Sequence, residues 1–245
     1  MPDISYAIHG RPTARAPLLL THGFGASQAM WAPNLDALDR DRRVLTWDLP
    51  GHGAASPSGE LSQDRCIADM LALLDMLDAP HAVLAGMSLG GFLSLLFHAR
   101  HPERVAALLL VDSGPGFRDG VAREQWNAWV AALAGDLDAR GPEALGPSPE
   151  SAVADHACGG PGLAAAARGI LTQRDGEVIE SLGSIAVPTL IVVGARDDRF
   201  LTAAEVMARR IPGARKLVIE DAGHAANMDQ PAAFNRAACE FLEGV

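Results

Sequence analysis

The sequence predicts an α/β protein, in which a doubly wound and mostly parallel sheet carries a small helical cap insertion. Short apolar runs alternate along the chain with segments whose apolar residues recur at helical intervals. These apolar runs are continuous instead of alternating with polar residues, as expected when helices cover both faces of a sheet. One long interval, residues 113–186, has no run that indicates a strand.

The expected elements follow from these patterns in chain order. Apolar runs predict strands over residues 5–9, 18–21, 43–48, 83–87, 105–112, 187–194 and 215–220. Helical spacing predicts helices over residues 28–38, 61–77, 89–101, 202–211 and 230–242. Pro102 marks one helix end, because a proline pushes the residue before it out of the helical region.

Residues 1–112 and 187–245 are expected to form the sheet domain, and residues 113–186 the helical cap. The interval is far longer than the dozen or so residues that a crossover between parallel strands requires. Helical spacing within it predicts helices around residues 118–137, 162–173 and 176–182, separated by segments rich in glycine and proline.

Composition narrows the class of protein. Acidic residues outnumber basic ones by 30 to 20, for a net charge of −10, and no basic stripe is visible, so a nucleic acid partner is not expected. The longest apolar runs, such as residues 105–111, are far shorter than the roughly 18 residues of a membrane-spanning helix. We therefore expect no membrane span. The sequence does not decide the oligomeric state, and a monomer or a homodimer is expected.

The cysteines and the amino terminus indicate the compartment. The three cysteines, Cys66, Cys158 and Cys239, are widely spaced and form no Cys-x-x-Cys pair, which suits unlinked thiols in a reducing environment. The first residues show neither a basic region nor an apolar stretch of the kind found in secretory signals. A cytoplasmic protein is expected.

The stretch Val83-Leu84-Ala85-Gly86-Met87-Ser88-Leu89-Gly90-Gly91 is the strongest local signal. An apolar strand stops at a serine that stands between glycines, and a helical pattern follows. This context predicts a nucleophile elbow, a turn so sharp that the serine takes a strained conformation and its hydroxyl is lifted out of the sheet. The glycines fit because side chains at those positions would collide across the turn.

A serine nucleophile needs a base within hydrogen-bond reach and a third group that orients the base. His224 follows the last strand, in Asp221-Ala222-Gly223-His224, on a loop of small residues. Asp197 follows the strand over residues 187–194, with Asp198 as its neighbouring competitor. Asp112, at the end of another strand, is a second alternative for the third group.

The order Ser88, Asp197, His224 is typical of α/β-hydrolases. From near residue 4 to near residue 243 the chain resembles the α/β-hydrolase fold family, and within it small bacterial esterases and the 3-oxoadipate enol-lactonase type. The cap alone lacks a matching signature. The resemblance rests on His22-Gly23-Phe24-Gly25, Asp48-Leu49-Pro50-Gly51-His52-Gly53, Gly86-Met87-Ser88-Leu89-Gly90-Gly91, Gly194-Ala195-Arg196-Asp197 and Ala222-Gly223-His224.

The resemblance implies a division of roles. Ser88 attacks an acyl carbonyl, His224 takes and later returns the proton, and Asp197 orients His224. The backbone N–H groups of Phe24 and Leu89 form the oxyanion hole. His22 and His52 are expected to shape turns. No cluster has metal-ligand spacing and no glycine-rich phosphate loop follows a strand, so no metal and no cofactor are expected.

The substrate pocket should lie between the strand ends and the cap. Arginines of the cap could receive a substrate carboxylate, as an enol-lactonase would need; these are Arg118, Arg123, Arg168 and Arg174. The expected lining of the pocket is Phe24, Trp31, Met87, Phe117, Trp126, Trp129 and Phe200.

The resulting hypothesis is a cofactor-independent serine hydrolase that cleaves a carboxylic ester, thioester or lactone of a small molecule through an acyl-enzyme intermediate. Two alternatives use the same three residues: hydrolysis of a C–C bond, and perhydrolysis with peroxide. A third is a small-molecule receptor that keeps the fold without catalysis.

Overall fold

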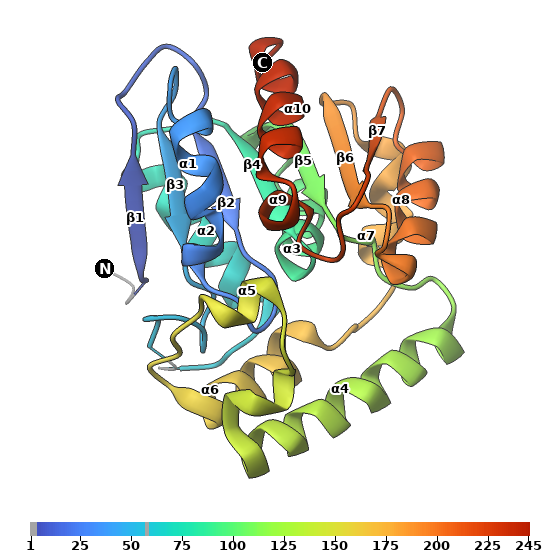
Figure 1. The fold of residues 1–245 in the computed structure, drawn as a ribbon. Coiled ribbons are helices and arrows are strands. Elements are labelled where there is room, and N and C mark those ends of the chain that lie inside the picture. Colours follow the sequence, from blue (N-terminus) through green and yellow to red (C-terminus); the bar gives the residue numbers. More distant parts are fainter. Residues whose placement is uncertain (1–3, 57–58) are drawn as a thin grey trace.

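A computed structural model describes residues 4–56 and 59–245. Within these residues a seven-stranded sheet forms the centre of the molecule, with helices on both of its faces (Figure 1). The strands run in the spatial order β1-β3-β2-β4-β5-β6-β7. The strands are β1 (Tyr6–His9), β2 (Leu18–Thr21), β3 (Val44–Trp47), β4 (Ala82–Met87), β5 (Val105–Val111), β6 (Thr189–Gly194) and β7 (Arg215–Ile219).

All neighbouring strands are parallel except β1, which pairs antiparallel with β3. On one side of the β2–β4 pair the sheet continues with β3 and β1, and on the other side it continues with β5, β6 and β7. Such a reversal of strand order leaves a crevice at the carboxyl ends of the strands, which is where α/β sheets bind ligands.

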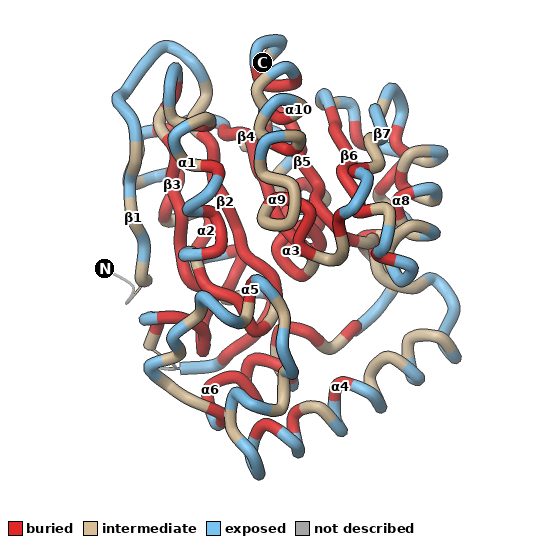
Figure 2. Tube along the Cα trace, viewed as in Figure 1, coloured by how far each residue is buried: buried red, intermediate tan, exposed pale blue. Residues whose placement is uncertain are grey.

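Alternate strand residues face two separate buried clusters. Leu20 and Ala85 pack with Phe234 on the face that α1 (Ala32–Leu38) and α10 (Pro231–Glu243) cover. Leu19 and Leu84 pack toward the opposite face, which α2 (Gln63–Met76), α3 (Leu89–Arg100) and α8 (Asp198–Arg210) cover. The inner strands β2 to β6 are accordingly buried on both sides, whereas β1 and the start of β7, at the two edges of the sheet, are partly exposed (Figure 2).

Between β5 and β6 the described chain is helical and forms no strand. Figure 1 shows α4, α5 and α6 grouped at one end of the sheet. The apolar side chains of Val130, Leu137 and Leu163 belong to the same buried cluster as those of α2 and α3, so this helical segment 113–186 packs on the sheet domain. Its main helices are α4 (Gly120–Arg140), α5 (Pro149–Ala152), α6 (Gly159–Ala166) and α7 (Glu177–Ser181).

The predicted fold class is confirmed, and every predicted strand is present with ends that differ by at most two residues. The helix expected over 202–211 instead begins at Asp198, directly after Asp197. Two short helices were not predicted, α5 and α9 (Ala226–Asp229), because four residues carry no helical period. Single turns complete the chain at η1 (Gln28–Trp31), η2 (Pro102–Arg104), η3 (Gly141–Leu145), η4 (Ala167–Leu171) and η5 (Leu182–Ser184).

No helix in the described ranges has the length and apolar character that crossing a membrane requires.

The turn from β4 into α3 depends on close backbone contact. A Cβ atom on Gly90 would lie 2.2 Å from the carbonyl oxygen of Thr21 in β2, and one on Gly86 would lie 2.2 Å from the backbone of Gly90. Real Cβ atoms do not approach backbone so closely. The absence of both side chains therefore allows α3 to start directly against β2 and β4.

We predict that Gly90→Ala lowers the free energy of unfolding by about 1–3 kcal/mol, because the added methyl group must push α3 away from β2. Gly135→Ala is the matched control, since a Cβ atom there meets nothing within 4 Å on the exposed face of α4. The control should gain up to about 1 kcal/mol from helix propensity. Urea unfolding measures both, and a Gly90→Ala protein as stable as wild type would contradict the described packing.

Candidate active site

Ser88 lies between the last residue of β4 and the first residue of α3. Its backbone is at φ 53° and ψ −114°, a conformation that residues other than glycine rarely adopt. Its N–H group donates to the carbonyl oxygen of Val111 in β5 at 2.9 Å, so the strained residue is still held by the sheet. The sharp turn predicted from the sequence is present.

The structure brings together the three residues that the sequence reading singled out. The hydroxyl of Ser88 donates to Nε2 of His224 at 3.0 Å, and Nδ1 of His224 donates to Oδ2 of Asp197 at 2.7 Å. Asp197 follows β6 and His224 follows β7. Because a carboxylate can only accept, the Asp197 bond places the proton on Nδ1 and leaves Nε2 as the acceptor for Ser88.

The pKa of His224 reflects two opposing effects. Burial alone would lower the pKa, but the hydrogen bond and the negative charge of Asp197 raise it. The charges of Asp112 and Glu150 raise it further, and the net result is a pKa above the ordinary 6.5. The raised pKa makes this imidazole a stronger base than an ordinary histidine, and its Nε2 accepts from the Ser88 hydroxyl.

The two alternative carboxylates are placed differently. Asp112 is fully buried, and its two oxygens accept from the N–H groups of Gly194 at 2.7 Å and Ala226 at 2.9 Å. Burial raises the pKa of Asp112 to about 7, against the effect of these two N–H donors. Asp198 is exposed in the first turn of α8. Asp112 therefore joins the end of β6, just before Asp197, to the residues after His224.

Two backbone N–H groups near Ser88 are without a protein acceptor among the described residues, those of Phe24 and Leu89. Leu89 is the first residue of α3, where the helix leaves its N–H groups unpaired. The Phe24 loop is close to the serine, because a Cβ atom on Gly23 would lie 3.3 Å from Cβ of Ser88.

Two histidines, the buried His22 and the half-buried His156, hold this loop. Nδ1 of His22 donates to the carbonyl oxygen of Gly23 at 2.7 Å, and its Nε2 accepts from the N–H of Leu49 at 2.9 Å. Burial lowers the pKa of His22 to about 4, so the ring is neutral at physiological pH. His156 of the helical segment bonds the same region, since its Nδ1 accepts from the Gly53 N–H and its Nε2 donates to the Gly25 carbonyl.

A cavity of about 430 Å³ opens beside Ser88 and Leu89. Phe117, Trp126 and Trp129 line it from the helical segment, and Phe200 lines it from α8. The Phe200 ring also stacks on the His224 imidazole at a centroid distance of 4.9 Å. These four aromatic residues stand where the sequence reading expected them.

The other three expected lining residues do not face this cavity. Trp31 is fully buried and packs on Phe234, at 6.3 Å between ring centres, because η1 presents its apolar side to the sheet. Met87 is buried beneath Gly23. The Phe24 ring lies edge-on to His52, at 5.1 Å. Each is a component of the core or of the loop that supports Ser88.

The four cap arginines are engaged elsewhere. Arg118 pairs with Glu180, Arg168 with Asp138 and Arg174 with Asp64. Arg123 donates to the carbonyl oxygen of Phe117. None of them is among the residues that line the Ser88 cavity.

Several polar residues around Ser88 were not found from the sequence. Gln125, Gln173 and Arg199 line the cavity, and no motif marks them. Glu150 of α5 is buried, its Oε2 atom has no hydrogen-bond partner among the described residues, and its charge acts on His224. Only the packing of α5 near α9 brings that carboxylate close to the histidine.

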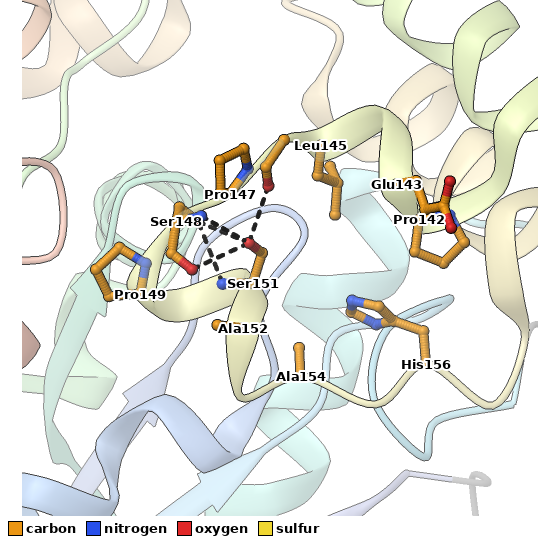
Figure 3. A pocket seen from close by; sticks show the side chains of 11 residues that line it. Pro142, Glu143, Leu145, Pro147, Ser148, Pro149, Ser151, Ala152, Ala154 and His156 are labelled. Carbon is orange, nitrogen blue, oxygen red and sulfur yellow. Dashed lines mark hydrogen bonds between the residues drawn. The ribbon is translucent and has the colours of Figure 1, made fainter.

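A second and larger hollow, of about 640 Å³, lies on the helical segment between Pro142 and His156 (Figure 3). Its two serines, Ser148 and Ser151, bond to one another in the cap of α5. Among the described residues no histidine or carboxylate is hydrogen-bonded to either of these serine hydroxyls. The smaller cavity beside Ser88 is therefore the better candidate site. The described residues also contain no group of three or more His, Cys, Asp and Glu side chains placed to hold a metal ion.

Comparison with known proteins gives the same architecture. The family model described as the alpha/beta hydrolase family matches residues 18–237. A putative carbamate hydrolase, RutD, of Variovorax paradoxus is 32% identical, over 99% of this chain and 97% of that protein. A thermophilic esterase from Thermogutta terrifontis superimposes with a TM-score of 0.80 at 27% identity, covering 98% of this chain and 93% of that one.

A further relative is longer than this chain. The dihydrolipoyllysine-residue acetyltransferase component of the acetoin cleaving system of Pseudomonas putida is 34% identical over 92% of this chain. The matched region spans 63% of that protein.

Asp112 offers a test of how the site is held. Asp112→Ala leaves the N–H groups of Gly194 and Ala226 buried without an acceptor, and we predict a loss of about 2–4 kcal/mol in the free energy of unfolding. Asp112→Asn keeps one acceptor oxygen but turns an NH2 group toward the other N–H, so it should lose at least half as much but less than Asp112→Ala. Chemical denaturation measures both variants, and equal losses would show that these two bonds do not hold the loops.

Proposed function

The chain belongs to the alpha/beta hydrolase family, and we propose that it cleaves a carboxylic ester, thioester or lactone of a small molecule through an acyl-enzyme on Ser88. One observation carries the proposal, the unbroken hydrogen-bond chain from Ser88 through His224 to Asp197. A serine hydroxyl becomes a useful nucleophile only when a base accepts its proton during attack. The names of the relatives, an esterase and a carbamate hydrolase, support acyl hydrolysis.

In the proposed acylation step, Ser88 Oγ attacks the carbonyl carbon while its proton moves to Nε2 of His224. The carbonyl oxygen becomes an oxyanion, which the free N–H groups of Phe24 and Leu89 would stabilise, each by about 3 kcal/mol. The amino end of α3 adds its positive dipole end at the same place. When the tetrahedral intermediate collapses, His224 returns the proton to the departing oxygen or sulfur atom.

In the proposed deacylation step, a water molecule takes the position of the departed group and gives a proton to His224. The resulting hydroxide attacks the ester carbon, and the proton passes to Ser88 Oγ as the carboxylic acid is released. Asp197 remains ionised throughout and stabilises the imidazolium that forms in both steps. The reaction consumes one water molecule and needs no cofactor.

We also propose that the helical segment 113–186 is the cap that selects the substrate. It supplies Phe117, Trp126 and Trp129 to the cavity wall, whereas the sheet domain supplies Ser88 and the proton relay. An aromatic wall of this kind favours an apolar or aromatic group next to the scissile bond.

We predict that a fluorophosphonate probe labels wild type and not Ser88→Ala, because only an activated hydroxyl displaces fluoride. Hydrolysis of 4-nitrophenyl acetate should fall by about 10⁴-fold or more in the variant. Ser184→Ala, which removes an exposed hydroxyl bonded to the Ser181 carbonyl, is the control and should label normally. Full labelling of Ser88→Ala would refute the assignment of the nucleophile.

The pH dependence of hydrolysis tests the base. His224 must be neutral to accept the proton, and its pKa is raised, so kcat/KM should decline with falling pH at a midpoint above 6.5. Glu150→Gln removes one of the negative charges that raise this pKa and should move the midpoint to lower pH. A midpoint at or below 6.5 in wild type, or no movement in the variant, would contradict this description of the base.

A further inference from the structure

The cavity beside Ser88 contains one charged side chain, that of Arg199, among the described residues that line it. The remaining lining is apolar or uncharged, with two carboxamides, Gln125 and Gln173. Arg199 is in the first turn of α8, two residues after Asp197. The helix that begins directly after the proposed triad acid therefore places a guanidinium at the substrate cavity.

The Arg199 guanidinium has no ion-pair partner in the described chain. Its neighbour Arg196, by contrast, is paired with Asp221. The central carbon of Arg199 lies over the Trp129 ring, 5.2 Å from the ring centre, and this cation–π contact holds the group at the cavity. The protein as a whole has a net charge of −10, but the unpaired Arg199 guanidinium makes the charge at this aromatic cavity positive.

Gln173 is a second polar group without a partner. It is only 6% exposed, and its side-chain amide makes no hydrogen bond with any residue that the structure describes. Its backbone is fixed by Asn127, whose side chain bonds both the N–H and the carbonyl of Gln173. A Cβ atom on Gly116 would lie 2.3 Å from Oε1 of Gln173, so the glycine leaves room for this amide. The amide faces the cavity, where it can donate a hydrogen bond to an oxygen atom of a bound ligand.

We infer that the substrate carries one carboxylate remote from its scissile bond and that Arg199 binds this carboxylate. The inference rests on the proposed function, because it assigns the substrate class of the same site. A guanidinium matches a carboxylate with two parallel hydrogen bonds. One positive charge balances a monoanion, whereas a phosphate monoester carries about −1.5 to −2 at neutral pH. The carboxamide N–H groups of Gln125 and Gln173 supply further donors that suit an oxygen anion.

The test compares matched esters in which a neutral group of similar size replaces the carboxylate. The first pair is 4-nitrophenyl hydrogen glutarate and 4-nitrophenyl pentanoate, with the carboxylate on the acyl side. The second pair consists of the butyrate esters of 4-hydroxybenzoate and 4-hydroxybenzamide, with the carboxylate on the alcohol side. The quantity measured is the ratio of kcat/KM for the anionic ester to kcat/KM for the neutral ester.

We predict that Arg199→Gln lowers this ratio about tenfold for at least one pair at low ionic strength. A tenfold change is what the loss of one charge-assisted hydrogen bond at an exposed site would cause. Arg199→Lys keeps the positive charge but lacks the two parallel N–H donors of the guanidinium, so its ratio should fall less than that of Arg199→Gln. Arg209→Gln is the matched control, because it removes the same charge from the far end of α8, where the Arg209 side chain donates to the Glu205 carbonyl. The ratio of the control should equal that of wild type.

A ratio that Arg199→Gln leaves unchanged for both pairs would overturn the inference and leave Arg199 as a cation stacked on Trp129. Binding to the Ser88→Ala protein separates this failure from failure of the proposed hydrolysis. Titration calorimetry uses monomethyl glutarate and methyl pentanoate for the acyl side, and the butyrate esters of 4-hydroxybenzoate and 4-hydroxybenzamide for the alcohol side. At least one anionic ligand should bind more tightly than its neutral partner, with the difference lost in the Ser88→Ala, Arg199→Gln double variant. No preference for the anion in either pair would count equally against the inference.

Discussion

The hydrogen-bond chain from Ser88 to His224 to Asp197 is the interaction on which the proposed chemistry depends, and the parallel sheet makes it possible. Each member follows a different strand, namely β4, β7 and β6, and the carboxyl ends of these strands lie at one edge of the sheet. A turn this tight at Ser88 requires that α3 touch β2, which the absence of a side chain at Gly90 permits. The strain at Ser88 is thus held by the packing of the core beneath it.

Asp112 has an unexpected part in this arrangement. It directly follows β5, the strand that lies between β4 and β6, and its buried carboxylate accepts from Gly194 at the end of β6 and from Ala226 just after the proposed base. The charge of Asp112 also adds to that of Asp197 in raising the pKa of His224. A carboxylate that looks like a rival of Asp197 in the sequence is therefore better described as a brace for the loops that carry Asp197 and His224.

The sequence predicts the strands and the position of Ser88 because continuous apolar runs and a serine between glycines leave a local pattern. It also predicts His224 and Asp197, since each follows a strand whose place in the sheet is set by topology. The cavity wall was predicted only in part. Trp31 and Trp126 are indistinguishable as apolar residues at helical spacing, and only tertiary packing directs the first into the core and the second to the cavity. Arg199 and Glu150 carry no motif, and their importance arises from which charges lie near them after folding.

The proposed reaction requires a covalent bond between the acyl group of the substrate and Ser88. Rapid mixing with a slowly released aryl ester, acid quenching and mass spectrometry of the digested protein test this claim directly. The account predicts a transient mass increase equal to the acyl group on the peptide that contains Ser88, formed together with a burst of the phenol. Steady release of phenol from a protein that never gains this mass would contradict it.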